Sequence, residues 1–221
     1  MDRFGLIGFP IGHSLSPRLF EAAYGGEYAY DLIEEERFED TFRRFSDGPY
    51  KAVNVTAPFK RNAAEKADLP SPEVQRLQAA NILLKTPQGI RAFNSDYLGI
   101  KLWLGKFEKS RSVAVIGGGG AGKAALLAAE DAGFGARLLH HGEIAGGVSA
   151  DIIIFTLPRA CGGCDRLFCE TLFEANYRDP ALKGHPGYVP GEEWLLAQAE
   201  TGYSLMTGKN PDIEAMKMAI F

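Results

Sequence analysis

Short apolar runs alternate with amphipathic stretches along the first half of the chain. The runs have the length of strands and are predicted as strands at residues 4–8, 28–33, 52–55 and 81–84. The stretches around them have helical spacing and are predicted as helices at residues 17–24, 37–45, 59–67 and 72–77. Alternation of this kind predicts an α/β fold with a mainly parallel sheet.

Residues typical of caps and turns mark the ends of several elements. Ser16 is the expected cap of the helix at 17–24, and Gly25 is expected to end it. Residues 86–89, Thr-Pro-Gln-Gly, predict a turn between two short strands. Near the end of the sequence, Asn210 is the expected cap of a last helix.

A second α/β unit is predicted after a helix at 97–105. Its strands are expected at 113–116, 137–140 and 152–156, with a helix at 120–132. Only residues 142–150 separate the last two strands, whereas a crossover with a helix needs at least about 10–12 residues. We therefore expect two domains, a substrate domain of residues 1–98 plus 199–221 and a Rossmann-like domain of residues 99–198 that lacks one crossover helix.

Composition and charge favour a small-molecule partner. The chain has 221 residues, 46% hydrophobic and 24% charged, with a net charge of -4. It therefore has no electrostatic reason to bind nucleic acid or an anionic membrane. No apolar run reaches the roughly 18 residues of a membrane helix, and residues 4–8 are too short for the apolar region of a signal peptide. A cytoplasmic protein, monomeric or homodimeric, is expected.

Cys161, Cys164 and Cys169 lie within nine residues, and the first two form a C-x-x-C pair. A zinc or redox site with His185 or the His140-His141 pair is one interpretation. The second C-x-x-C or the close pair of histidines of a structural zinc site is missing, which favours reduced thiols without a metal.

A glycine-rich turn follows the strand at 113–116. Gly117, Gly119 and Gly122 satisfy G-x-G-x-x-G at the start of a helix, where backbone N–H groups and the helix dipole favour a pyrophosphate. A turn that only lets strand and helix pack closely is the alternative. The expected dinucleotide site comprises Gly117, Gly118, Gly119, Gly120, Ala121, Gly122, His140 and His141.

The tip of the next strand does not distinguish NADP from NAD. A dinucleotide fold usually places an acid for NAD, or an arginine for NADP, at that tip. Here His140 and His141 occupy it. The sequence therefore leaves cofactor choice open, and the missing crossover helix after this strand predicts a shallow adenosine side.

Lys60 and Asp96 are candidates for acid/base chemistry because each stands where an apolar strand gives way to a helix. A solvated lysine and an aspartate that caps a helix are the ordinary alternatives. Asn54, Thr56, Asn81 and Asn94 also lie near the ends of strand-like stretches, and such ends converge on one crevice in an open α/β sheet. A buried lysine beside an aspartate can transfer a proton at a carbonyl oxygen that becomes an alkoxide.

Ser14 and Ser16 place two hydroxyls on the turn before the first helix, a position that suits a substrate carboxylate. Ser16 is expected to cap that helix as well. His13, between them and the first strand, is either catalytic or a loop histidine with local hydrogen bonds, and the second is the more common case.

Taken in order, these motifs resemble those of shikimate dehydrogenases. Residues 8–17 are similar to the family's opening motif, residues 54–60 (NVTAPFK) to its catalytic-lysine motif, and residues 94–96 (NSD) to the segment with its catalytic aspartate. Residues 79–81 (AAN) resemble its substrate asparagine segment, residues 191–199 its late glutamine segment, and Tyr177 with Pro180 its tyrosine-proline element.

The resemblance implies reversible, NADP-dependent reduction of 3-dehydroshikimate to shikimate, a step of chorismate and aromatic amino acid biosynthesis. It also implies the site residues. Lys60 and Asp96 would be catalytic, and the substrate would be bound by Ser14, Ser16, Thr56, Lys60, Asn81, Asp96, Tyr177 and Gln198.

The cofactor half departs from the family. His140-His141 replace an asparagine-arginine pair, and residues 155–157 (FTL) replace asparagine-alanine-threonine. An NAD-dependent quinate/shikimate dehydrogenase and a non-catalytic shikimate-binding protein therefore stay open as alternatives.

Overall fold

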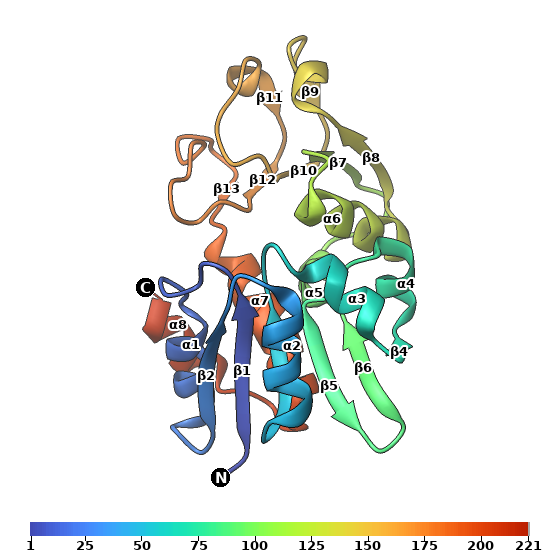
Figure 1. Ribbon diagram of the computed structural model, residues 1–221. Coiled ribbons are helices and arrows are strands. Elements are labelled where there is room, and N and C mark those ends of the chain that lie inside the picture. Colours follow the sequence, from blue (N-terminus) through green and yellow to red (C-terminus); the bar gives the residue numbers. More distant parts are fainter. Residues whose placement is uncertain (221) are drawn as a thin grey trace. The chain divides into compact units, whose positions relative to one another are not determined.

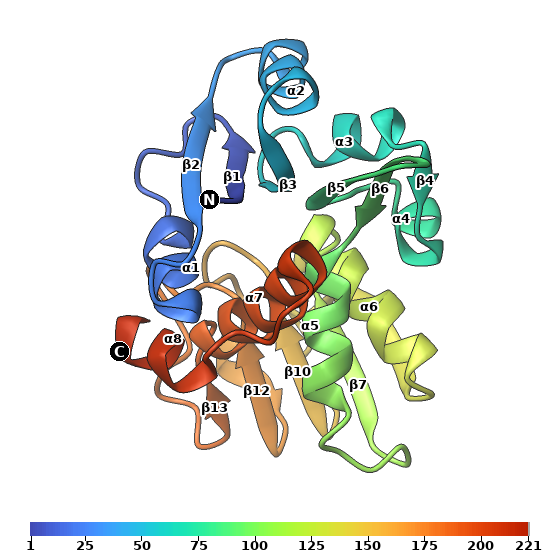
Figure 2. The ribbon, with the colours of Figure 1, turned by 90° about the horizontal axis from the view of Figure 1, so that it is seen from below.

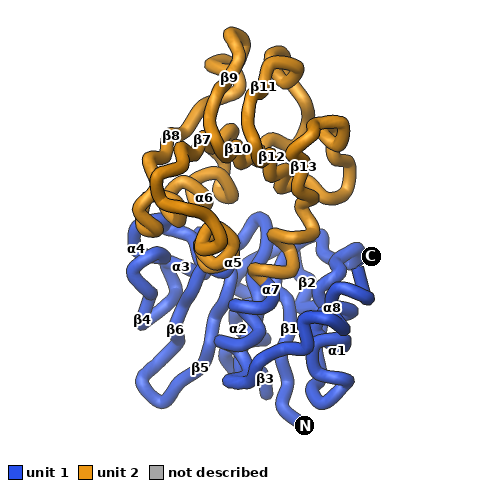
Figure 3. The backbone as a smooth tube through the Cα atoms, turned by 180° about the vertical axis from the view of Figure 1, so that it is seen from behind, with its two compact units in different colours: residues 1–95, 199–221 blue, residues 96–198 orange. Residues whose placement is uncertain are grey.

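The computed structural model describes residues 1–220 and divides the chain into two compact units (Figure 3). The first unit comprises Met1–Ser95 and the C-terminal segment from Ala199, and the second comprises Asp96–Gln198. Two helices contain the boundaries, α5 (Ser95–Leu104) and α7 (Glu192–Thr207).

The first unit is built on a six-stranded sheet with the order β2-β1-β3-β5-β6-β4. Its pairs are parallel except for the two that β5 makes with β3 and β6. The prediction of a mainly parallel α/β fold is therefore confirmed. The strands are β1 (Arg3–Gly8), β2 (Ala29–Glu34), β3 (Tyr50–Val55), β4 (Leu69–Pro70), β5 (Ile82–Thr86) and β6 (Gly89–Phe93).

Helices cover both faces of this sheet. Figure 2 shows α2 and α3 on one side of β1–β3, and α1 and α8 on the other. On the second side the ring of Phe20 in α1 lies 5.2 Å from that of Phe4 and 4.9 Å from that of Tyr203. The helices are α1 (Ser16–Tyr24), α2 (Phe38–Asp47), α3 (Lys60–Lys66), α4 (Pro72–Leu77) and α8 (Ile213–Ile220).

Two of the predicted helix caps are wrong. Ser16 is the first residue of α1, and the Ser14 hydroxyl accepts its N–H at 3.2 Å, so the serine two positions earlier takes the role of an N-terminal acceptor. The carboxylate of Asp212, two residues after Asn210, accepts the N–H of Ala215 in α8 at 2.9 Å. In both cases the backbone N–H at the helix start is bonded by a side chain two positions away from the predicted cap.

The second unit has a five-stranded, wholly parallel sheet with the order β13-β12-β10-β7-β8 (Figure 1). Helix α6 (Gly120–Asp131) connects β7 to β8, and Gly133 after it has φ 88°. The strands are β7 (Ser112–Ile116), β8 (Gly135–Leu139), β10 (Ile152–Phe155), β12 (Thr171–Glu174) and β13 (Tyr188–Val189).

The predicted loss of a crossover helix between β8 and β10 is confirmed, and the loss extends further. Within the described residues, the connections β8–β10, β10–β12 and β12–β13 contain no α-helix. They contain instead the one-turn 3-10 helices η1 (His141–Glu143) and η2 (Cys164–Arg166), and the short strands β9 (Val148–Ser149) and β11 (Leu167–Phe168), which pair in parallel.

Apolar side chains from these irregular connections take over the packing role of the missing helices. Ile144, Leu167 and Leu182 are buried in one cluster with Phe155 and Leu172 of the sheet. This burial removes the sheet face from water without a helix.

The opposite face of the second sheet packs against helices. The ring of Phe173 in β12 lies 4.4 Å from that of Trp103 in α5 and 5.9 Å from that of Trp194 in α7. Among the described residues, no helix is long and apolar enough to cross a membrane.

Candidate active site

Backbone hydrogen bonds tie together the segments of the first unit that contain the predicted substrate residues. After β3, the N–H of Thr56 donates to the carbonyl of Ile7 in β1 at 2.8 Å. At the start of α3, the carbonyl of Lys60 accepts the N–H of Ala80 at 2.8 Å. Because Asn81 follows Ala80, the structure brings the Thr56, Lys60 and Asn81 segments to the carboxyl ends of β1 and β3.

The last residue of β1 must be small for this arrangement. A Cβ on Gly8 would lie 2.5 Å from the Cγ2 atoms of both Ile11 and Thr56. The loop after β1, which contains Ser14 and leads to Ser16 at the start of α1, therefore packs directly against the loop with Thr56.

The two predicted serines form a hydrogen-bonded pair. The Ser14 hydroxyl donates to the Ser16 hydroxyl at 3.2 Å, and both residues are half-buried. His13, next to them, is exposed. The two serine hydroxyls therefore face each other at the start of α1, and their joint binding of a carboxylate stays a prediction.

Two tyrosines that the sequence analysis missed complete this group of hydroxyls. The Tyr203 hydroxyl donates to the carbonyl of Ser16 at 3.3 Å, and the Tyr30 hydroxyl donates to Oδ1 of Asn54 at 2.8 Å. Burial raises the pKa of Tyr203 and of Tyr30 well above the ordinary value, so both stay neutral donors.

The signal for Tyr203 in the sequence is faint. It is a buried aromatic residue five positions after Gln198 in a helix, and it is 187 residues from Ser16 along the chain. A pairing so distant in sequence depends on how α7 packs against α1, which the pattern of α7 alone does not specify.

The Asn81 side chain makes a hydrogen bond within the fold, in addition to its predicted role in binding the substrate. The residue is 5% exposed, and its Oδ1 accepts the N–H of Ser95 at 2.6 Å. Ser95 begins α5, and the next residue is Asp96. Asn81 therefore fixes the start of the helix that contains the candidate catalytic aspartate.

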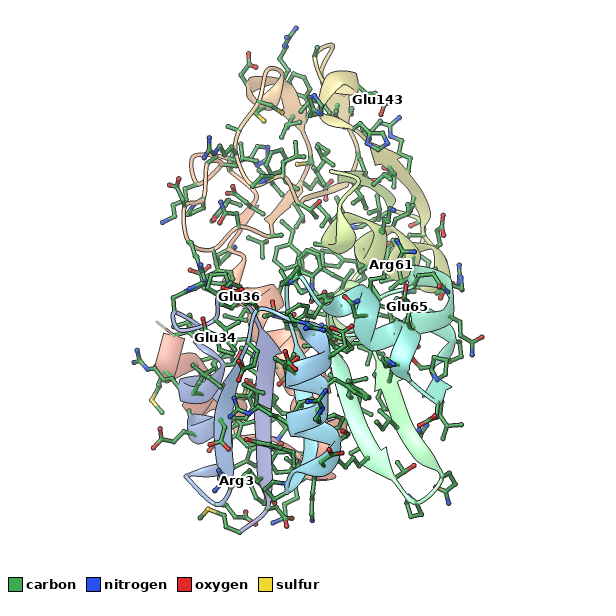
Figure 4. The ribbon with its side chains drawn as sticks, viewed as in Figure 1. Arg3, Glu34, Glu36, Arg61, Glu65 and Glu143 are labelled. Atoms are coloured by element: carbon green, nitrogen blue, oxygen red, sulfur yellow. The ribbon has the colours of Figure 1, made fainter. Side chains whose placement is uncertain are left out.

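Lys60 differs clearly from the cation next to it. Lys60, the first residue of α3, is half-buried. The Arg61 side chain is 81% exposed and pairs with Glu65 one turn later, with 3.0 Å between Nε and Oε1 (Figure 4). Of these two consecutive cations, Lys60 is the one that the fold withdraws from solvent.

Within the second unit, helices α5 and α7 bring Asp96 and Gln198 into one region. The carbonyl of Asp96 accepts the indole N–H of Trp194 at 3.1 Å. A Cβ on Gly99 would lie 2.7 Å from the backbone nitrogen of Gln198. Tyr177 is half-buried between β12 and β13. Lys60 belongs to the other unit, so its pairing with Asp96 stays a prediction.

The glycine turn has both close packing and open space. Gly117 has φ 114°, and a Cβ on Gly122 would lie 1.7 Å from the carbonyl oxygen of Gly117. At Gly119 and Gly120 a Cβ would meet nothing within 4 Å. Strand and helix are therefore packed as closely as glycine allows, and the mouth of α6 leaves room for an anion.

His140 lies against this turn. A Cβ on Gly118 would lie 2.5 Å from Cε1 of the His140 ring. The backbone N–H of His140 donates to Oε2 of Glu143 at 2.6 Å, which closes the turn that begins at His141 (Figure 4). The end of β8 thus presents an imidazole beside the glycine turn, and His141 next to it is exposed.

In residues 1–220, no group of three or more His, Cys, Asp or Glu side chains could hold a metal ion. The three cysteines are unbridged and half-buried.

Comparison with known proteins supports the predicted family. Residues 6–83 match the family model of the shikimate dehydrogenase substrate binding domain. The shikimate dehydrogenase (NADP(+)) of Haloarcula marismortui is 34% identical over 179 residues, which cover 76% of this chain and 64% of that protein. That of Halorubrum lacusprofundi is 37% identical over 147 residues, which cover 60% and 53%.

Solved structures match over nearly the whole chain. The shikimate 5-dehydrogenase of Thermus thermophilus in complex with NADP(H) and shikimate has a TM-score of 0.86 at 25% identity, covering 99% of this chain and 98% of that one. An Ael1 enzyme from Pseudomonas putida has a TM-score of 0.85 at 27% identity, covering 100% and 99%.

The two sheets define a two-unit α/β protein whose second unit is Rossmann-like. With the family match of residues 6–83 and the relatives above, the chain belongs to the shikimate dehydrogenase family, and the resemblance of its motifs is confirmed. The sequence matches span about half to just under two thirds of the length of these curated relatives.

Proposed function

We propose that the protein is a shikimate dehydrogenase that reversibly reduces 3-dehydroshikimate to shikimate with NADP. The observation that carries this proposal is the match of fold, over nearly the whole chain, to an enzyme solved with NADP(H) and shikimate. We assign most of the substrate binding to the first unit, with Asp96, Tyr177 and Gln198 contributed by the second, and we assign nicotinamide binding to the second unit. The protein is proposed to be a monomer or homodimer of the cytoplasm.

The glycine turn fits the pyrophosphate of a nicotinamide cofactor. The first-turn N–H groups of a helix have no intrahelical partner, and here open space lies before them at Gly119 and Gly120. Gly117 and Gly122 would shape the turn, Gly118 and Ala121 would line it, and His140 and His141 would lie on the adenosine side. NADPH, when bound, supplies the hydride.

The residues of the chain would hold the substrate and manage a proton. Ser14 and Ser16 would bind the carboxylate with neutral hydroxyls, and Thr56, Asn81, Tyr177 and Gln198 would bind the ring hydroxyls. Lys60 would donate a proton to the carbonyl oxygen during reduction and recover it in the reverse reaction, with Asp96 orienting the ammonium group.

The test is the near-ultraviolet absorbance of reduced nicotinamide when the purified protein meets shikimate or quinate, each with NADP and separately with NAD. Absorbance that rises faster with NADP is the expected result. Turnover on quinate with NAD, but not on shikimate with NADP, would favour the quinate/shikimate alternative. Folded protein without turnover on either substrate would overturn the proposed activity.

A non-catalytic shikimate-binding protein is the second candidate, and the position of His140 favours it. Its imidazole lies against Gly118 where a dinucleotide would approach the turn. Calorimetry separates the two candidates, because the enzyme must bind NADP or NAD and the binding protein would bind shikimate alone.

We expect Tyr203→Phe to raise the KM for shikimate about tenfold with little change in kcat. The change removes the hydroxyl that donates to the carbonyl of Ser16, and a hydrogen bond between neutral groups is worth about 0.5–1.5 kcal/mol, of which the upper end is about tenfold in affinity. When a substitution weakens binding of the substrate and of the transition state by the same free energy, KM rises and kcat does not change. Steady-state kinetics and calorimetry with shikimate measure both effects.

Tyr24→Phe is the matched control for this experiment. Tyr24 belongs to the same aromatic cluster, but its hydroxyl bonds to Thr207 and to the carbonyl of Lys209. A similar loss of thermal stability in both variants, with a changed KM only in Tyr203→Phe, would assign the effect to the serine pair. An unchanged KM in Tyr203→Phe would remove this tyrosine from substrate binding.

A further inference from the structure

The connection between β10 and β12 contains a pair of thiols that the proposed activity does not use. The Sγ atoms of Cys161 and Cys164 lie 3.9 Å apart. The backbone N–H of Cys161 donates to Sγ of Cys164 at 3.3 Å. A hydrogen bond of this kind stabilises negative charge on the acceptor, so Cys164 is the sulfur prepared to act as a nucleophile.

The backbone holds this pair in a tight turn. Gly163 has φ 98°, and a Cβ there would lie 2.1 Å from the carbonyl oxygen of Ile144. Ile144 itself is buried in the core of the second unit. The turn between the two cysteines is therefore anchored to the core and keeps the sulfurs near each other, which raises their effective concentration for a reaction together.

Cys169 has a different environment. Its sulfur lies 3.7 Å from Nε2 of His185, and burial raises its pKa to about 11. Burial and the neighbouring Cys164 also raise the pKa of Cys161. Since the thiolate is the reactive form, Cys169 is expected to be the inert thiol, and Cys161 to react only after Cys164.

We propose that Cys161 and Cys164 are a reversible thiol–disulfide site that reacts with low-molecular-weight disulfides. The thiolate of Cys164 attacks one sulfur of the small disulfide, which forms a mixed disulfide and releases one small thiol. Cys161 then loses its proton to solvent, attacks Cys164 and releases the second small thiol. One dithiol and one disulfide thus give one internal disulfide and two thiols.

The test is equilibration of the folded protein in mixtures of glutathione and glutathione disulfide, followed by acid quenching, alkylation and mass spectrometry. We expect the oxidised protein to be lighter by two hydrogens before alkylation, with residues 161 and 164 linked and Cys169 alkylated. Oxidation should reverse when glutathione is added. A wild-type protein that gives only glutathione adducts, or a bridge to Cys169, would overturn the proposal.

Three variants separate the steps. Cys161→Ser should accumulate a glutathione adduct on Cys164, because the resolving thiol is gone, and Cys164→Ser should react much more slowly at Cys161. Cys169→Ser is the matched control and should oxidise as the wild type does. Equal reactivity of all three thiols in the folded wild type would contradict a specific site, and this result does not depend on dehydrogenase activity.

Discussion

Lys60→Ala is expected to lower kcat for shikimate oxidation by about 10²–10⁴-fold, the usual contribution of a positioned acid or base. Lys60 begins α3, is half-buried, and has its backbone tied to Ala80 beside Asn81. Truncation removes the ammonium group and leaves these backbone bonds in place. The measurement is kcat and KM from nicotinamide absorbance, with circular dichroism to show that the fold is retained.

Lys66→Ala is the matched control, because Lys66 ends the same helix and is exposed. It should leave kcat unchanged. Asp96→Asn should lower kcat by a similar factor to Lys60→Ala if the two residues act as one unit, and the double variant should then lose little more than either single variant. Near-wild-type rates in both single variants would remove these residues from the chemistry.

Local patterns predicted most strands of both sheets, because the burial of alternate or continuous apolar residues is a property of each segment. They did not predict β4, β12 or β13, which have only two to four residues each. They also predicted the turn at residues 86–89, where the Thr86 hydroxyl donates to the carbonyl of Gly89. The caps of α1 and α8 were predicted at the wrong residues. Each helix start has two polar residues two positions apart, and only the path of the backbone decides which side chain accepts the free N–H group. The acceptors are Ser14 and Asp212.

The connections of the second unit were only partly predictable. The short segment at 142–150 excluded a helix by its length alone. The connection from β10 to β12 is long enough for a helix, and its Pro158, Gly162 and Gly163 were the overlooked signal against one. Buried Ile144 and Leu167 from these connections do the packing, which no periodicity in the sequence indicated.

Candidate site residues that lie together in a sequence motif could be predicted. Those that reach the site only through packing of distant segments could not. The serine pair and the glycine turn are contiguous in sequence, so spacing alone indicated them. Tyr203 reaches Ser16 only because Phe20 packs between Phe4 and the Tyr203 ring. Such long-range contacts follow from the assembled core and from no local rule.

Gly122→Ala is expected to lower the free energy of unfolding by about 1–3 kcal/mol and to abolish measurable NADP binding. The added Cβ would lie 1.7 Å from the carbonyl oxygen of Gly117 and 2.9 Å from Oγ1 of Thr156. Neither the backbone of the turn nor the end of β10 can move without opening the packing between β7 and α6. Chemical denaturation measures the stability, and calorimetry measures the binding.

Gly135→Ala is the control for this substitution, because Gly135 lies at the start of β8 and a Cβ there would meet nothing within 4 Å. It should bind NADP as the wild type does and unfold at about the same denaturant concentration. Shikimate binding should survive in Gly122→Ala, since Ser14, Ser16 and Thr56 belong to the other unit and none of the candidate substrate residues of the second unit lies in the glycine turn. Full NADP affinity in Gly122→Ala would show that the nicotinamide does not depend on this turn, and the assignment of the second unit would then be wrong.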